Sequence, residues 1–140
     1  MKQQTIFEII NNMDKVTNQL IVGWNKLFQE DLGVSHILVL GHLAELGNSR
    51  PSDIAKNLGL TPPTLTHLSE KLVKKQLVTR LADENDRRII YLAITDEGKE
   101  MFARASDEGI VLRHKLFERL TDEETEQLLS IYRKLNAPSE

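Results

Sequence analysis

An aspartate and two arginines stand together at Asp86-Arg87-Arg88, inside a run of mostly charged residues. The flanking segments, residues 77–80 and 89–94, are rich in residues that favour β-strands, so the run is predicted to form the loop of a hairpin. A guanidinium at such a tip fits the narrow minor groove of DNA, and a neighbouring carboxylate can fix its geometry. Charged loops are commonly only solvated turns, so the meaning of this one depends on what precedes it.

A helix with a polar outer face is predicted over residues 61–72, directly before the hairpin. Thr61 is its expected N-cap, and Pro62 and Pro63 occupy the first two helical positions, where a missing N–H group removes no intrahelical bond. The Thr61 hydroxyl can then cap only the amide of Thr64 or of a later residue. Such a rigid start suits a helix end that enters a groove.

The outer face of this helix carries the candidate DNA contacts. Leu65, Leu68 and Leu72 point inward, whereas Pro63, Thr66, His67, Glu70 and Lys74 point outward, with Thr64 and Lys71 on the flanks. Thr66 and His67 are candidates for base edges, and Lys71 and Lys74 for phosphates, which supply affinity but little sequence information. Glu70 either accepts from a cytosine amino group or pairs with Lys74, and we favour the pair. The alternative for the whole face is simple solvation.

Charge is distributed unevenly along the chain in a way that agrees with a DNA contact. A short helical pattern over residues 51–60, which includes Ser52, completes the order helix, helix, hairpin of a winged helix-turn-helix. Residues 50–91 hold eight Lys or Arg and five Asp or Glu, for a net charge of +3, whereas the remainder carries −6 and the whole chain −3. The acidic body is therefore expected to lie away from the phosphates.

Further helices are predicted on both sides of this region. Apolar residues spaced by threes and fours indicate a long helix over the first thirty residues, with more apolar surface than a small core can cover. A second helix is expected over residues 34–46, with Ser35 near its start, buried between the terminal helices and the DNA-binding part. Thr95 is the expected N-cap of a long helix from Asp96 towards 117 or 120, which Gly109 weakens or bends. Residues 121–124 form a capping box for the last helix.

Several classes of function are disfavoured by composition. The chain has no cysteine, so it can form no disulfide, thiolate metal site or thiol redox sensor. No apolar run approaches the roughly 18 residues of a membrane span, and the start lacks a signal-peptide pattern, which points to a cytoplasmic protein. No phosphate-binding loop, paired carboxylates or Ser/His/Asp arrangement is recognisable, so we expect neither an enzyme nor a cofactor.

The sequence resembles the MarR (multiple antibiotic resistance regulator) family of bacterial transcription factors over essentially its whole length. The most specific likeness is the run of residues 80–88 with Asp83 and Asp86-Arg87-Arg88, followed by residues 92–98, where Ile94 replaces the usual Leu. The resemblance implies a homodimer with interlocked terminal helices, recognition helices in the major groove of a palindromic site, and wing arginines in the minor groove. It assigns Arg88 to the minor groove, Asp86 to bracing it, and Arg87 and Arg80 to nearby phosphates.

Two residues depart from the family pattern. His67 stands where relatives often have arginine, which puts that base contact in doubt and would make its strength depend on pH. Gln76 stands where a glycine commonly ends the recognition helix in a left-handed turn. A residue other than glycine there is expected to cost about 1 kcal/mol or to end the helix in a different way.

Three other interpretations stay open at this stage. Some relatives sense zinc, but His36, His42 and His114 show no paired ligand spacing and are interpreted as ordinary helix histidines. A winged helix used only for protein assembly would carry apolar groups on the recognition face and wing, where this chain has basic ones. The family also often binds small aromatic or phenolic acids in a cleft, which here would draw on Trp24, Phe28, His36 and residues near Phe102. Because such aromatics are more often core, no ligand site is assigned.

The sequence is therefore interpreted as one mainly α-helical domain over residues 1–140 with a small β-hairpin wing. Residues 34–95 are the expected DNA-binding lobe, and residues 1–33 and 96–140 the helical dimerisation region. The expected function is a homodimeric repressor of a palindromic operator, relieved by a small ligand. Helix contacts are assigned to Ser52, Thr61, Pro63, Thr64, Thr66, His67, Lys71 and Lys74, and wing contacts to Arg80, Asp86, Arg87 and Arg88.

Overall fold

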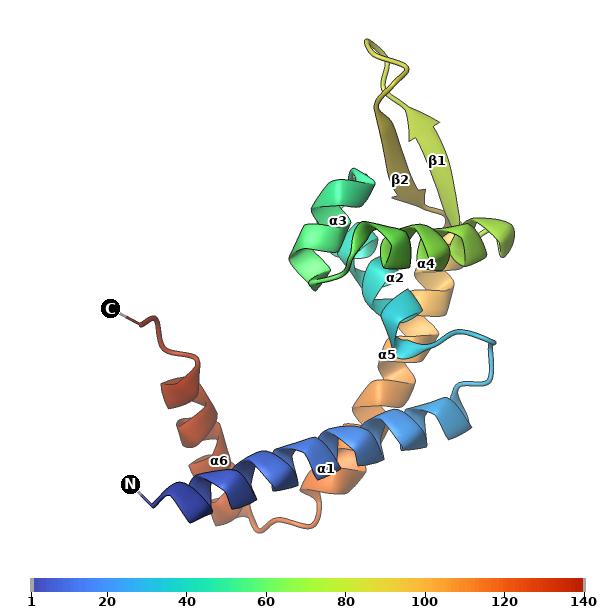
Figure 1. The fold of residues 1–140 in the computed structure, drawn as a ribbon. Coiled ribbons are helices and arrows are strands. Elements are labelled where there is room, and N and C mark those ends of the chain that lie inside the picture. The colour runs from blue at the N-terminus through green and yellow to red at the C-terminus, as the bar shows by residue number, and fades with distance from the viewer. Residues whose placement is uncertain (1, 140) are drawn as a thin grey trace.

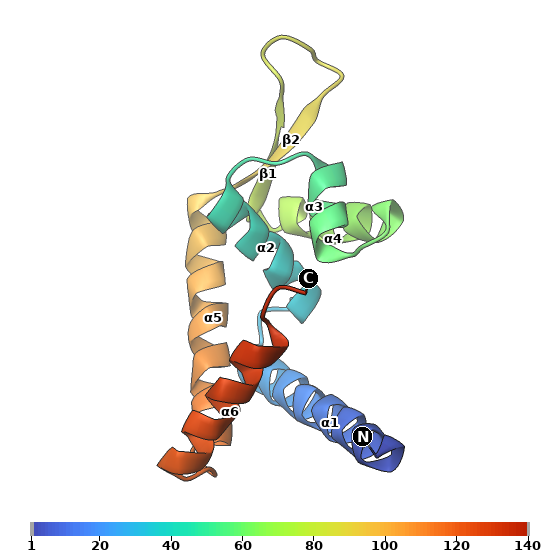
Figure 2. The same ribbon diagram turned by 90° about the vertical axis from the view of Figure 1, so that its left-hand side faces the viewer.

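The computed structural model describes residues 2–139. Their elements follow the order α1 (Gln3–Leu27), α2 (Val34–Leu46), α3 (Pro51–Leu58), α4 (Pro62–Lys74), β1 (Val78–Ala82), β2 (Ile90–Ile94), α5 (Asp96–Phe117) and α6 (Asp122–Leu135). A lobe of α2, α3, α4 and the hairpin sits at one end of α5, and α1 crosses the other end, as Figure 1 shows. The turned view in Figure 2 confirms that the hairpin projects away from α1 and α6. The mainly helical, winged architecture agrees with the sequence interpretation.

The core is centred in the lobe, where it joins all of its elements, and it extends to Trp24, Phe28 and Leu32 at the end of α1 and to Ala105 of α5. Its largest fully buried side chains are Val39, Leu40, Leu43, Ile54, Leu65, Leu72, Val78 and Leu92. Burial of each such side chain contributes about 1.5–3 kcal/mol. Leu65 and Leu72, on the apolar face of α4, are among them, so the opposite face of α4 is held toward solvent, as its periodicity predicted.

The hairpin is a two-stranded antiparallel sheet, in which Val78 pairs with Ile94 and Ala82 with Ile90. The first strand extends to Ala82, two residues further than its composition indicated, and the loop shortens to residues 83–89. The backbone hydrogen bond from Asp83 N–H to the Ile89 carbonyl, 2.9 Å long, closes the end of the ladder. The second strand begins at Ile90, one residue later than its composition indicated, and the charged tip projects beyond the lobe, as Figure 1 shows.

Helix α4 ends in a left-handed residue that is not glycine. Gln76 has φ 64°, its N–H donates to the Val73 carbonyl, and the Leu77 N–H donates to the Leu72 carbonyl. This bonding pattern is a Schellman motif, which normally places glycine at the left-handed position. The Gln76 carbonyl accepts from the Thr95 hydroxyl at 2.7 Å, which ties the end of α4 to the start of α5.

Side-chain caps set the starts of α5 and α6 as expected, whereas α2 begins differently. Thr95 Oγ1 accepts from the Gly98 N–H at 3.0 Å, and Thr121 and Glu124 form the expected capping box of α6. At α2, however, the N-cap is Gly33, whose N–H donates to His36 Nδ1 at 3.0 Å. The expectation that Ser35 starts this helix was therefore wrong. Gly33 is the N-cap, and the side chain that bonds at the helix start is His36 in the first turn. Helix α5 continues through Gly109 without a break.

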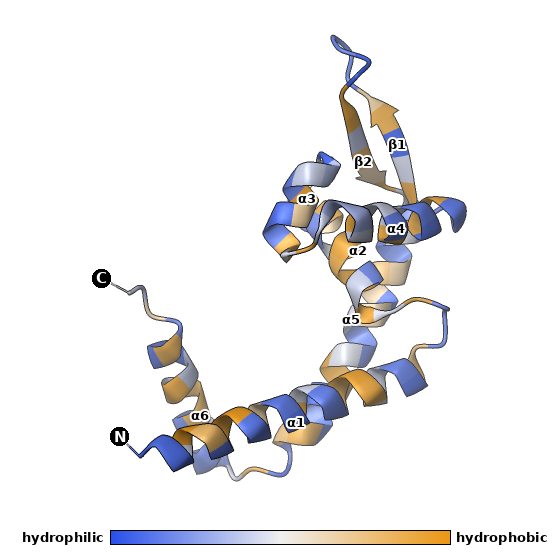
Figure 3. Ribbon diagram, in the orientation of Figure 1, coloured by the Kyte–Doolittle hydropathy of each residue, from blue (hydrophilic) through white to orange (hydrophobic). Residues whose placement is uncertain are grey.

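The terminal helices leave apolar surface uncovered. Helix α1 buries Trp24, whose Nε1 donates to the Ala105 carbonyl of α5 at 3.1 Å, but it exposes a row of large apolar side chains: Phe7, Ile9, Ile10, Met13, Val16, Ile21, Val22 and Leu27. Helix α6 buries no residue at all. Figure 3, coloured by residue hydropathy, shows hydrophobic residues alternating with hydrophilic ones along both helices. Within the described residues, no helix is long and apolar enough to cross a membrane.

Candidate nucleic-acid interface

Threonine hydroxyls form hydrogen bonds at the start of α4, and these bonds determine which donors and acceptors remain available on each hydroxyl. Thr61 Oγ1 accepts from the Thr64 N–H at 3.3 Å and donates to Thr64 Oγ1 at 2.9 Å, as the two prolines required. The Thr66 hydroxyl donates to the Pro62 carbonyl at 3.0 Å. Thr64 therefore keeps its own proton for donation, whereas Thr66 offers lone pairs and a methyl group. Those are the groups that match a phosphate and a base edge, respectively.

The polar face of α4 is open to solvent along its length. Pro63, Thr64, Thr66, His67 and Lys74 are exposed, and Ser52 lies exposed on α3. Among the described residues no ion pair joins Glu70 to Lys74, so the pairing that we favoured was wrong in this structure. The Lys74 ammonium is left without a carboxylate partner in that part of the chain.

Lys71 differs from Lys74, because its ammonium is engaged. Its Nζ lies 3.2 Å from Asp31 Oδ1, in the turn between α1 and α2. The hydrogen bond and charge of Lys71 hold the pKa of the Asp31 carboxyl below its ordinary value. Sequence reasoning assigned Lys71 to phosphate and did not anticipate this partner.

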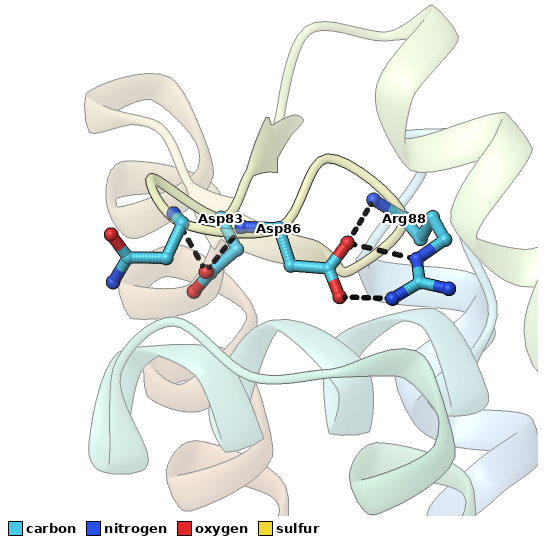
Figure 4. A network of polar contacts seen from close by, with 4 residues as sticks. Asp83, Asp86 and Arg88 are labelled. Carbon is cyan, nitrogen blue, oxygen red and sulfur yellow. Dashed lines mark hydrogen bonds and ion pairs between the residues drawn. The ribbon is translucent and has the colours of Figure 1, made fainter.

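The wing tip is organised by two carboxylates (Figure 4). Asp86 Oδ1 accepts from both the backbone N–H and Nε of Arg88 at 3.0 Å, and Oδ2 accepts from the terminal guanidinium nitrogen at 3.0 Å. These bonds lower the pKa of Asp86 and raise that of Arg88. Asp83 Oδ2 accepts from the Asn85 and Asp86 N–H groups, which shapes the loop. The bracing of Arg88 by Asp86 thus has the geometry that the resemblance implied.

Other basic residues lie close to the tip. Arg80, Arg87 and Arg88 are exposed. Arg50, directly before α3, places its guanidinium carbon 6.0 Å from the centroid of the Tyr91 ring, and its charge also lowers the pKa of Asp86. The sequence analysis assigned no role to Arg50 or to Asp83. An aspartate whose side chain accepts from the backbone N–H two residues later is a recognised turn signal, so Asp83 could have been found from the sequence. No neighbouring residue indicates that Arg50 approaches the wing.

The histidines occupy separate environments. His36 uses Nδ1 to accept from Gly33, and its buried Nε2 has no hydrogen-bond partner among residues 2–139. The pKa of His36 is lowered mainly by burial and, to a smaller extent, by the positive charges of Lys71 and His67. His42 is buried, with Nε2 3.2 Å from Ser49 Oγ, and His114 is exposed on α5. No group of three metal-ligating side chains comes together between residues 2 and 139.

A cavity of about 480 Å³ opens between α1, α2 and α5. Trp24 and Phe102 line it, together with Ile37, Leu112 and the polar side chains His42, Glu45 and Arg113. The expected cleft was right about Trp24 and Phe102 but wrong about Phe28 and His36, which do not line it. Phe28 instead packs in the core with its ring centroid 4.7 Å from that of Trp24.

Comparison with known proteins agrees with this geometry. The MarR family model matches residues 32–90. The HTH-type transcriptional repressor MdtR of Bacillus subtilis is 33% identical over 76% of this chain and 68% of its own length. The HTH-type transcriptional regulator YpoP of the same organism is 25% identical over 97% of this chain and 96% of its own. A MarR family protein from Bacillus stearothermophilus has the same fold, with a TM-score of 0.82 at 19% identity, covering 96% of this chain and 95% of its own.

The family model and the hairpin tip coincide in the chain. The matched residues run from the end of the α1–α2 turn to the first residue of β2, so they include α4 and the Asp86–Arg88 pair. The repressor MdtR extends the likeness well beyond them. This chain belongs to the MarR family of transcriptional regulators.

Proposed function

We propose that the chain is a homodimeric repressor that binds a palindromic operator in duplex DNA and is released by a small ligand. The observation that carries the DNA contact is the pair Asp86–Arg88 at the exposed tip of a wing, where the carboxylate of Asp86 accepts two hydrogen bonds from the guanidinium and one from the backbone N–H of Arg88. A guanidinium held in advance loses little side-chain freedom when it enters a minor groove. Such a regulator acts on DNA in the cytoplasm.

The recognition helix supplies the major-groove contacts of this proposal. Thr66 and His67 face the base edges, while Thr61, Pro63, Thr64 and Ser52 lie against the backbone at the helix starts. Lys71 and Lys74 neutralise phosphates, and their contribution depends on salt because binding releases counterions. The exposure of this face and the rigid capped start of α4 support the assignment.

The wing supplies the minor-groove and flanking contacts. Arg88 enters the groove and Asp86 holds it there, while Arg87 and Arg80 approach phosphates. The basic wing and helix face also argue against a module used only for protein assembly, which would carry apolar groups in these places.

Homodimerisation is supported by the uncovered apolar surface of α1 and α6. A helix of 14 residues with no buried side chain is marginal alone in water, because most helical stability in proteins comes from packing. In α6, Leu129, Ile131, Tyr132 and Leu135 are exposed, and α1 carries a longer row of the same kind. A second copy would bury both faces and set the spacing of two recognition helices.

Ligand control is supported by the cavity between α1, α2 and α5. Its size and its mainly apolar lining suit a small aromatic molecule, and Arg113 offers a cation for an acidic group. The cavity lies between the helices proposed for dimerisation and the DNA-binding lobe. A bound ligand would therefore alter how the lobe sits on the dimer, and so the distance between the two recognition helices.

The deciding experiment is fluorescence-anisotropy binding to duplex DNA from just upstream of the chain's own gene, over a salt series and against scrambled competitor. We expect tight binding per dimer that falls steeply with salt and resists the scrambled duplex. No binding at low salt would overturn the proposal in favour of an assembly role, or of a regulator that must bind a ligand before it grips DNA. Adding small aromatic acids to the bound complex then tests release.

A further inference from the structure

The turn between α1 and α2 contacts the proposed recognition helix α4 through the carboxylate of Asp31. Asp31 Oδ1 lies 3.2 Å from Lys71 Nζ, and the Lys71 side chain is 34% exposed against 80% for Asp31. The lysine is therefore drawn down onto the protein surface, while the carboxylate stays accessible to solvent. No such partner occupies Lys74, one turn further along α4, among the ion pairs of residues 2–139.

The backbone of the turn is arranged so that Asp31 can make this contact. Asp31 has φ 55°, a left-handed conformation that a non-glycine residue adopts only at some cost, with Asn and Asp the best tolerated. The adjacent Glu30 is anchored in a different direction, because its Oε1 accepts from Arg104 of α5 at 3.0 Å. The turn is thus fixed on α5 by one carboxylate and directs the next one to α4.

We propose that Asp31 competes with DNA phosphate for Lys71 and so sets the affinity of the recognition helix. This inference rests on the proposed function, since it requires that the outer face of α4 meets DNA. Lys71 either leaves Asp31 to bind a phosphate, or it keeps one of its three N–H donors on Asp31, whose negative charge then offsets its own. In both cases the carboxylate lowers the net gain from this lysine.

The strength of the competition follows from the exposure of the pair. Exposed ion pairs are weak, and a phosphate within a duplex offers a much higher local density of negative charge. Asp31 is therefore expected to reduce DNA affinity moderately without preventing binding. Lys71 lowers the pKa of Asp31 most, and the charges of Lys75 and His36 also lower this pKa, but more weakly.

The first test replaces one carboxylate at a time. Asp31→Asn removes the charge but keeps a residue that tolerates the left-handed backbone. We expect it to tighten operator binding by about two- to five-fold and to steepen the salt dependence by about one ion per protomer. Glu30→Gln is the matched control, since it removes the same charge one residue away but breaks a contact with α5. It is expected to change affinity and salt slope much less.

The second test separates action through Lys71 from a general effect of negative charge near DNA. Asp31→Asn is repeated in a Lys71→Gln background, with thermal unfolding used to confirm that every variant folds. If Asp31 acts through Lys71, the gain disappears there; if the gain persists, or if Asp31→Asn has no effect in the parent, the inference is wrong. Wild-type protein that binds its operator specifically while Asp31→Asn changes nothing overturns only this inference. Wild-type protein that binds no DNA overturns the proposed function as well.

Discussion

The carboxylate of Asp86 holds Arg88 by three hydrogen bonds, one to the backbone and two to the guanidinium. Both side chains belong to the same short loop, so the guanidinium is fixed relative to the wing and not to the lobe. Its position in a groove is consequently set by how the hairpin as a whole approaches DNA.

Truncation of the wing arginine tests this arrangement. Arg88→Ala should weaken operator binding and relax any preference for A·T pairs beside each half-site, since the minor groove is read mainly through its width and potential. Asp86→Ala should act in the same direction but less strongly, because the arginine remains and only its geometry is lost. Binding to operators with A·T or G·C flanks measures both effects. Arg87→Ala is the control and should reduce the salt slope without changing flank preference; an unchanged preference in Arg88→Ala would refute the wing assignment.

A phosphate contact on α4 has a different signature. Lys74→Ala should weaken binding to operator and scrambled duplex alike and reduce the salt slope by about one ion per protomer. The reason is that a lysine free of carboxylate partners gives up only counterions when it meets phosphate. Competition titrations at several salt concentrations supply the measurement. A loss confined to the operator would place Lys74 at a base instead.

Glycine at position 98 is required by a close backbone approach. A side chain there would run into the Leu77 carbonyl and Ile94, neither of which can move freely. Gly98→Ala should lower the free energy of unfolding by about 2–3 kcal/mol, as overpacking of a fixed site does. Gly109→Ala on the same helix is the counterpart, since its new methyl group meets only the end of the Arg113 side chain at 3.1 Å. It should raise stability by up to about 1 kcal/mol, and urea unfolding at one fixed protein concentration compares the two.

The left-handed end of α4 offers a stabilising substitution. Gln76→Gly should raise the free energy of unfolding by about 1 kcal/mol, because glycine adopts this conformation without the clash that a β-carbon causes. Gln76→Ala keeps the β-carbon and should leave stability nearly unchanged. Equal stability of the Gly and Ala variants in urea unfolding would show that the Schellman motif is not strained.

Stability should also depend on pH through His36. Burial lowers its pKa below the ordinary value of 6.5, so between those two pKa values the unfolded chain binds more protons than the folded one. Stability from this residue is therefore complete above about pH 6.5 and declines as the pH falls through that window. Asp31 and Asp86, whose pKa values lie below 3.8, lose their contributions only at much lower pH. Urea unfolding at pH 7.5 and 5.5 should show a smaller difference for His36→Asn, which keeps an acceptor for Gly33; an equal difference would assign the effect elsewhere.

The features predicted well from sequence are those that neighbouring residues determine. Thr61, Thr95 and Thr121 cap their helices because a hydroxyl and an amide three residues later are enough to form the bond. The Asp86–Arg88 bracing is likewise contained within one loop. Such contacts need no knowledge of the tertiary fold.

The features that sequence reasoning missed depend on how distant segments meet. The Asp31–Lys71 pair requires a left-handed turn and the docking of α1 and α2 against α4, neither of which periodicity reveals. The lining of the cavity depends on where α1 ends: Trp24 lies within the helix and borders the cavity, whereas Phe28 follows the last helical residue with an extended backbone and packs only in the core. A capping role for His36 was missed because Ser35 is the more usual type of residue at a helix start.

Trp24 is the chain's single tryptophan. Its indole donates to the Ala105 carbonyl of α5, stacks near Phe28 and borders the cavity, all at the junction of α1 with α5. The intrinsic fluorescence of the protein is therefore a one-site optical report on that junction. Undocking of α1 or entry of a molecule into the cavity will shift the tryptophan emission, whereas events confined to the distant wing will leave that emission unchanged.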